Sequence, residues 1–161
     1  MERRTLFAAG ALAAVMPIAR LAHAQGAPDA EKQNILLAGN FALLSSRMAA
    51  DKASDAAVKA FATLEVSEQE AVARAFGAAP SEQLMPEHAT MIEQLSALSG
   101  AEFDSMYLQG QMTGHEQLRE LHAAYAESGS DPMARGASIV GVPAIDTHMS
   151  MLRAIQQRLG G

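Results

Sequence analysis

Apolar residues recur at steps of three and four along most of the 161-residue chain, which is the spacing of amphipathic helices. A first helix is predicted from about residue 31 to 51, and a second from about 54 to 76 with Ser54 as its N-cap. After a break at residues 77–86, a short helix follows Pro86. None of these stretches shows the alternation of a β-strand, so the pattern indicates an all-α protein.

Two further long helices are predicted in the C-terminal half. Ser99 and Glu102 have the spacing of a capping box, which predicts a helix from there to about residue 127. Asp131 as N-cap and Pro132 at the first helical position predict the last helix. Pro143 is expected to bend or split this helix, because proline has no amide hydrogen. Four long helices with short connections predict an antiparallel four-helix bundle, with the short helix as an extra element between the second and third.

The start of the chain has the layout of an export signal. Arg3 and Arg4 precede an apolar run, which ends in the small-residue triplet Ala22-His23-Ala24. This layout predicts a signal peptide over residues 1–24, and the paired arginines are compatible with twin-arginine as well as general secretory export. We therefore expect a periplasmic or secreted protein, with a flexible tail at residues 25–32 and the helical bundle at residues 33–158.

Composition narrows the classes of function. The formal net charge of the chain is −6, and removing the three arginines and one glutamate of the leader changes it to −8. This charge argues against nucleic acid as a partner, because phosphate binding needs clustered Lys and Arg. The chain has no Cys, which excludes disulfides, thiolate metal sites and cysteine nucleophiles. After the leader, no apolar run predicts a transmembrane anchor. Whether the protein forms a homo-oligomer stays open.

Polar residues on the inward helix faces are the candidates for chemistry. Glu65 falls on this face of the second helix, His115 on that of the third long helix and His148 on that of the last. They can meet inside the bundle, where buried polar groups need partners or a ligand. Two imidazoles and one carboxylate form a donor set for a single transition-metal ion, Fe, Zn, Mn or Cu. The simpler alternative is that these groups hydrogen-bond one another, the backbone or water.

Other sites have weaker support in the sequence. No His is preceded three positions earlier by Glu, so the chain lacks the Glu-x-x-His pairs of di-iron bundles. The segment His148-Met149-Ser150-Met151, together with Met91, Met106 and Met112, offers imidazole and thioether groups that suit Cu(I), but methionines at helical spacing are more often core residues. There is neither a G-x-S-x-G elbow nor a glycine-rich phosphate loop, and Gly110 and Gly114 instead favour close approach of helices. The sequence therefore favours a protein that is not an enzyme.

Several motifs resemble those of the DUF4142 family. The residues that carry the resemblance are Val58-Lys59-Ala60-Phe61, Glu87-His88, the block from Leu95 to Tyr107, Gly114-His115, Asp131-Pro132, Val142-Pro143 and His148. The most specific piece is the Leu-Ser-Gly-x-x-Phe-Asp-x-x-Tyr pattern within that block. The resemblance covers about residues 33 to 157. It implies an exported bacterial protein with a ferritin-like four-helix fold and no settled biochemical activity.

The chain departs from the family pattern in its inward polar residues. The family usually has an Asp-His pair where this chain has Glu68 and Gln69, and it has glutamates on the first helix that this chain lacks. Of the polar cluster that the resemblance implies, His115 and His148 carry over, and Glu65 can replace part of the missing carboxylate. Two functions stay open: a non-enzymatic binding protein of the envelope or of stress responses, and a mononuclear metal-binding protein.

Overall fold

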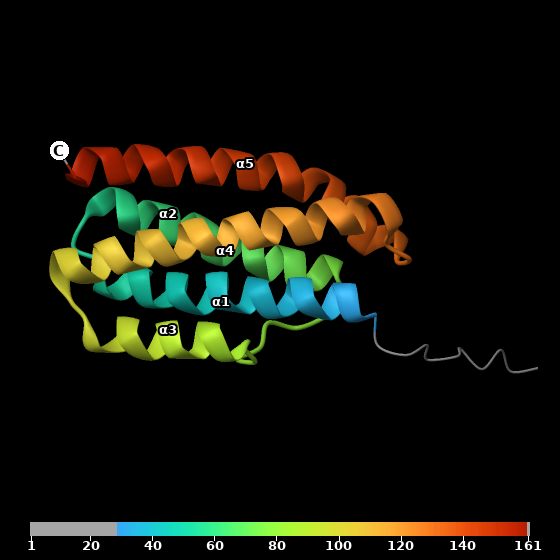
Figure 1. Ribbon diagram of the computed structural model, residues 1–161, viewed down its shortest axis with the longest axis horizontal. Helices are drawn as coiled ribbons and strands as arrows, with labels where there is room; N and C mark the ends of the chain where they lie inside the picture. The colour runs from blue at the N-terminus through green and yellow to red at the C-terminus, as the bar shows by residue number, and fades with distance from the viewer. Residues whose placement is uncertain (1–28, 161) are drawn as a thin grey trace, which may run out of the picture.

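The computed structural model describes residues 29–160, which form five helices (Figure 1). Their bounds are α1 (Ala30–Lys52), α2 (Ala56–Ala75), α3 (Pro86–Ala97), α4 (Gly100–Ser128) and α5 (Pro132–Gly160). No strand occurs within the described range, so the all-α prediction is confirmed. The predicted signal peptide and residues 25–28 of the predicted tail lie outside the described residues.

The four long helices α1, α2, α4 and α5 form a bundle in which each runs antiparallel to its neighbours (Figure 1). Because α2 and α4 run in the same direction, the chain must return between them to the end at which α2 begins. The short helix α3 makes this return while it packs against α1 and α4. The extra helix therefore lies where it was predicted, and a bundle with one such crossover has the topology of ferritin-like folds.

The start of α2 differs from the prediction in its capping residue. The carboxylate of Asp55, not the hydroxyl of Ser54, accepts hydrogen bonds from the first amides of the helix, at 2.8 and 3.2 Å. Ser54 contacts α4 instead: its amide and hydroxyl donate to the buried carboxylate of Asp104. The amide of Asp55 donates to the same carboxylate. Asp104 therefore ties the turn between α1 and α2 to α4.

Two other helix starts also refine the sequence analysis. Ser99 is the N-cap of α4, but its side chain makes no capping hydrogen bond, so the predicted capping box with Glu102 is wrong. The chain enters α4 through Gly100 at φ 59°, whereas a capping box has a helical residue at this position. Asp29 caps α1, which begins at Ala30, so residues 30–32 lie in the helix rather than in the preceding tail.

The last helix, α5, is continuous through Pro143. The proline does not split the helix, although it removes one backbone donor and crowds the carbonyl of the preceding turn. Figure 1 shows the first turns of α5 slanting relative to the rest of the helix, which agrees with the predicted bend.

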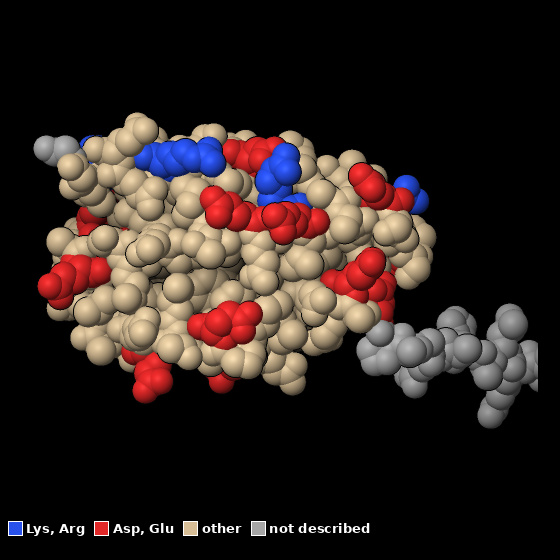
Figure 2. All heavy atoms as spheres, in the orientation of Figure 1, with Lys and Arg blue, Asp and Glu red and all other residues tan. Residues whose placement is uncertain are grey.

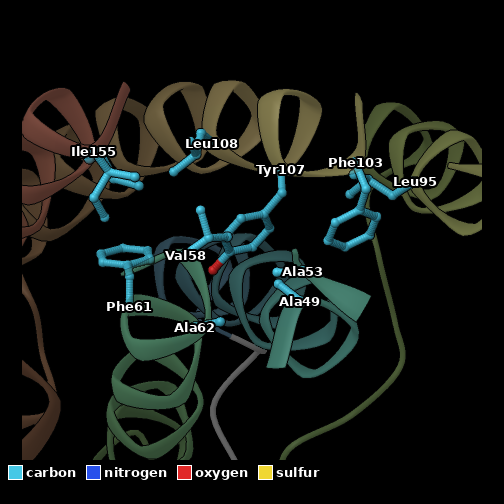
Figure 3. Packing of buried hydrophobic residues seen from close by; sticks show 11 residues of the cluster. Ala49, Ala53, Val58, Phe61, Ala62, Leu95, Phe103, Tyr107, Leu108 and Ile155 are labelled. Atoms are coloured by element: carbon cyan, nitrogen blue, oxygen red, sulfur yellow. The ribbon is translucent and has the colours of Figure 1, made fainter. Parts of the chain in front are cut away.

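Aromatic and small side chains fill the core between the helices. Figure 3 shows Tyr107 pointing from α4 toward α1 and α2, where Phe61 belongs to the same buried cluster. Phe41 of α1 lies against two glycines of α4: a Cβ added at Gly114 would lie 3.3 Å from its ring, and one at Gly110 would lie equally close. The absence of side chains at these positions lets α1 and α4 approach closely, as predicted.

On the face that Figure 2 shows, most of the surface is uncharged and most of the charged side chains are acidic. Asp and Glu side chains are spread over this face, and the Lys and Arg side chains in view lie along its upper edge, where Figure 1 places α5. This distribution agrees with the net charge of −6. Within residues 29–160, no helix combines the length and the apolar character needed to cross a membrane.

Candidate metal centre

The structure brings together Glu65 of α2, His115 of α4 and His148 of α5 in the interior of the bundle. The Oε2 atom of Glu65 lies 3.3 Å from Nε2 of His115 and 3.1 Å from Nδ1 of His148. The same two ring nitrogens are 3.3 Å apart. All three side chains are buried, with exposed fractions of 0, 1 and 6%. Three donor atoms from three helices therefore surround one point.

The spacing of these donor atoms suits a small metal ion. Two donors that are each about 2.1 Å from Zn²⁺ lie about 3.4 Å apart at a tetrahedral angle. At the right angle of an octahedral site the separation is about 3.0 Å. The observed separations of 3.1 and 3.3 Å fall within this range.

Each imidazole has its outer nitrogen engaged by a group that only accepts hydrogen bonds. Nδ1 of His115 lies 2.8 Å from the backbone oxygen of Gln111, and Nε2 of His148 lies 3.2 Å from Oε2 of Glu68. A carbonyl or carboxylate oxygen cannot donate, so the outer nitrogens carry the hydrogens. When the rings are neutral, as metal binding requires, the inner nitrogens present lone pairs to the centre, which is the usual arrangement of metal-binding histidines.

The carboxylate of Glu65 is held in a similar way. The amide nitrogen of Gln69, one turn along α2, donates to its Oε1 at 2.8 Å. Oε2 has no hydrogen-bond partner among the described residues, although the two ring nitrogens lie within 3.3 Å of it. Gly39 of α1 makes room for Gln69, because a Cβ at Gly39 would lie only 2.7 Å from Oε1 of Gln69. The packing therefore directs one carboxylate oxygen at the centre.

Charges within the cluster are strongly coupled. Burial alone would raise the pKa of Glu65, but the contacts and charges of His115 and His148 outweigh it and lower this pKa to about 2. Burial would lower the pKa of His148, but contacts with Glu65 and Glu68 and their negative charges raise it to about 10. Without a metal, an ionised Glu65 therefore faces a protonated His148 at neutral pH. A metal ion would compete with that proton for the same point.

The ring of Phe61 borders the centre, and several methionines near it pack in the core. The ring of Phe61 lies 5.9 Å from that of His115 and 5.6 Å from that of His148, centroid to centroid. Met149, next in sequence to His148, packs in a cluster with Leu118. Met91, Met106 and Met112 are partly buried and also pack against a core cluster. These four thioethers serve packing, whereas Met151, the other methionine next to His148 in sequence, is exposed. Packing therefore explains most of the sequence pattern that suggested Cu(I).

The other two described histidines lie outside the centre. Nδ1 of His122 is 3.0 Å from the hydroxyl of Ser138. Burial lowers the pKa of His122 to about 4, against an opposing effect of the charge of Glu68. His88 stacks on the ring of Phe41 at 4.4 Å, and burial lowers its pKa as well. Both imidazoles are thus suited to packing in the neutral form.

The sequence did not point to Glu68 as part of this centre. It lies three residues after Glu65, and this spacing places two side chains on the same side of a helix. The sequence therefore contained a hint of this position, but an acidic residue beside the inward face of a helix is usually solvated. Only the tertiary structure shows that it contacts His148.

Within residues 29–160, fold and site together define a helical bundle with a buried carboxylate–imidazole cluster. The family model described as "Domain of unknown function (DUF4142)" matches residues 17–155, and the chain belongs to this family. The resemblance found in the sequence is thereby confirmed. Comparison with curated proteins and with solved structures gave no match. The family description states no activity, so the function has to be argued from the site.

Proposed function

We propose that the protein binds one divalent transition-metal ion through Glu65, His115 and His148. The observation that carries the proposal is the convergence of three donor atoms, separated by 3.1 to 3.3 Å, whose outer partners already hold them in place. Two imidazoles and one carboxylate suit Zn²⁺, Fe²⁺ and Mn²⁺. Ca²⁺ and Mg²⁺ prefer oxygen donors, and Cu(I) prefers sulfur.

The proposal is one of binding, in the cell envelope. The described part of the chain supplies three ligands, so an ion bound by them keeps at least one position for water or a small ligand. Export follows from the leader predicted at residues 1–24. A non-enzymatic envelope protein without a metal is the other candidate. In that case the cluster is a buried network in which His148 keeps its proton between two carboxylates.

Metal titration tests the proposal directly. Metal-free protein is mixed anaerobically with Zn²⁺, Fe²⁺ or Mn²⁺ at neutral pH, freed of excess ion and analysed for elemental content. We expect one ion per chain in the wild type and loss of binding in His148→Ala and Glu65→Gln. His122→Asn is the matched control, because it removes a buried imidazole of the same bundle that lies outside the cluster. The control is expected to bind like the wild type.

Thermal unfolding supplies an independent measurement. At a free metal concentration 100 times the Kd, mass action stabilises the folded state by about 2.7 kcal/mol. For a domain of this size that corresponds to a rise in Tm of roughly 8–10 °C. The rise should be absent in His148→Ala. No stoichiometric binding in the wild type, or equal binding in both ligand variants, would overturn the proposal.

A further inference from the structure

Glu68 connects the buried centre with the protein surface. Its Oε2 lies 3.2 Å from Nε2 of His148, the ring nitrogen that faces away from the centre. The side chain of Glu68 is 29% exposed, whereas those of Glu65 and His148 are 0 and 6% exposed. Among the described residues, its ion-pair partner is His148 and not a Lys or Arg. The contact therefore serves the cluster rather than a separate surface ion pair.

The contact restricts what the imidazole of His148 can do. A neutral imidazole has one N–H and one lone pair, which can exchange places between the two nitrogens. A carboxylate at Nε2 holds the hydrogen there and leaves the lone pair on Nδ1, which faces Glu65. It also opposes rotation of the ring, which would turn a carbon atom toward the centre.

The three ligands differ in how strongly they are held. The outer partner of His115 is a neutral backbone oxygen of Gln111, and that of Glu65 is the neutral amide of Gln69. His148 alone of the three has an ionisable carboxylate at this position. At equal distance a charged acceptor interacts more strongly with an N–H group than a neutral one does. The Glu68 contact, at 3.2 Å against 2.8 Å for the other two, is therefore the outer contact whose charge can be removed by substitution.

We propose that Glu68 is a positioning residue for metal binding by His148. The proposal rests on the metal-binding function proposed above. Glu68 does not contact the ion; it fixes the tautomer and the orientation of the ring and makes the inner nitrogen a better donor. Loss of such an outer partner typically lowers metal affinity by about 10- to 100-fold.

A graded set of variants tests this role. The Zn²⁺ affinity of the wild type, Glu68→Gln and Glu68→Ala is measured by competition with a chelator. The amide oxygen of Gln still accepts from Nε2 but carries no charge, so we expect affinity to decrease from Glu to Gln to Ala. Glu70→Gln is the matched control, because Glu70 also lies on α2 but pairs with Arg47 at 2.8 Å. This control is expected to keep the wild-type affinity.

The tautomer supplies a readout that a purely structural role would not change. Long-range ¹H–¹⁵N spectra of the zinc-loaded protein are expected to show His148 bound through Nδ1 with the hydrogen on Nε2. In Glu68→Ala this pattern should weaken or become mixed. If Glu68→Ala does not fold, Glu68→Gln still provides the affinity and the spectrum.

The possible outcomes separate the two proposals. If the wild type binds zinc and both Glu68 variants bind it equally well with an unchanged spectrum, the role of Glu68 is refuted while the metal site stands. If the variants lower only the Tm of the metal-free protein, the role is also refuted. If the wild type binds no metal, both proposals fall together.

Discussion

Acidification is expected to destabilise the protein through His122. This imidazole is buried, 5.7 Å from the ring of Phe76, with Nδ1 3.0 Å from the hydroxyl of Ser138. Burial lowers its pKa from the usual 6.5 to about 4, and the charge of Glu68 opposes this effect only in part. As the pH falls, the unfolded chain takes up this proton before the folded one does. Stability contributed by neutral His122 is therefore lost between pH 6.5 and 4.

The size of the effect follows from the difference between the two pKa values. Each pKa unit corresponds to about 1.36 kcal/mol, so the full loss below pH 4 is about 3.4 kcal/mol. At pH 5 the unfolded imidazole is mostly protonated and the folded one mostly neutral. The loss between pH 7.5 and pH 5 is then about 2 kcal/mol.

Urea unfolding of metal-free protein at pH 7.5 and pH 5 measures this loss. His122→Asn is the comparison, because Asn keeps a polar atom near the position of Nδ1 for Ser138 but does not titrate. All other groups titrate in both proteins and cancel in the difference. We expect the wild type to lose about 2 kcal/mol more than the variant. An equal loss in the two proteins, or an NMR titration that gives His122 an ordinary pKa, would refute the reasoning.

Three other substitutions follow from close contacts in the structure. Gly39→Ala is expected to displace Gln69 and so lower Zn²⁺ affinity by about tenfold in the chelator assay; unchanged affinity would contradict this. Asp104→Asn replaces a carboxylate that accepts hydrogen bonds from three donor groups at the start of α2, at a cost of about 1–3 kcal/mol in urea unfolding. Gly114→Val is expected to overpack the core against Phe41 and so to lower the stability by about 1–3 kcal/mol, measured by thermal unfolding. In contrast, Gly136→Ala, which meets nothing within 4 Å, should stabilise α5 by about 0.5–1 kcal/mol.

The helices were predictable because their apolar spacing is a local property of the chain, but some of their caps were not. Ser54 and Asp55 are both good capping residues. Which of them turns back toward α2 depends on Asp104, whose carboxylate binds Ser54 from 50 residues further along the chain. At α4, a left-handed Gly100 replaced the expected capping box. A sequence pattern does not contain such contacts between distant segments.

The candidate site was predictable to a similar extent. Helical periodicity placed Glu65, His115 and His148 on inward faces, which limits where they can lie around each helix axis. It could not give their relative heights along the bundle, because these depend on how α3 returns the chain to the start of α4. The 3.3 Å separation of the two ring nitrogens therefore had to come from the structure. The same holds for Glu68, whose contact with His148 depends on how α5 docks.

The distribution of the ligands along the chain has a consequence for the timing of assembly. The first ligand lies on α2, the second on α4 and the third on α5, so a growing or partly translocated chain that lacks its last helix has only two of them. The proposed centre is complete only after α5 docks, and metal loading would be a late event in maturation. A bound ion would also join α5 directly to α2, although α5 packs mainly on α4. Because such a bond forms at the end of folding, it would mainly slow the detachment of the last helix and have little effect on the rate of folding.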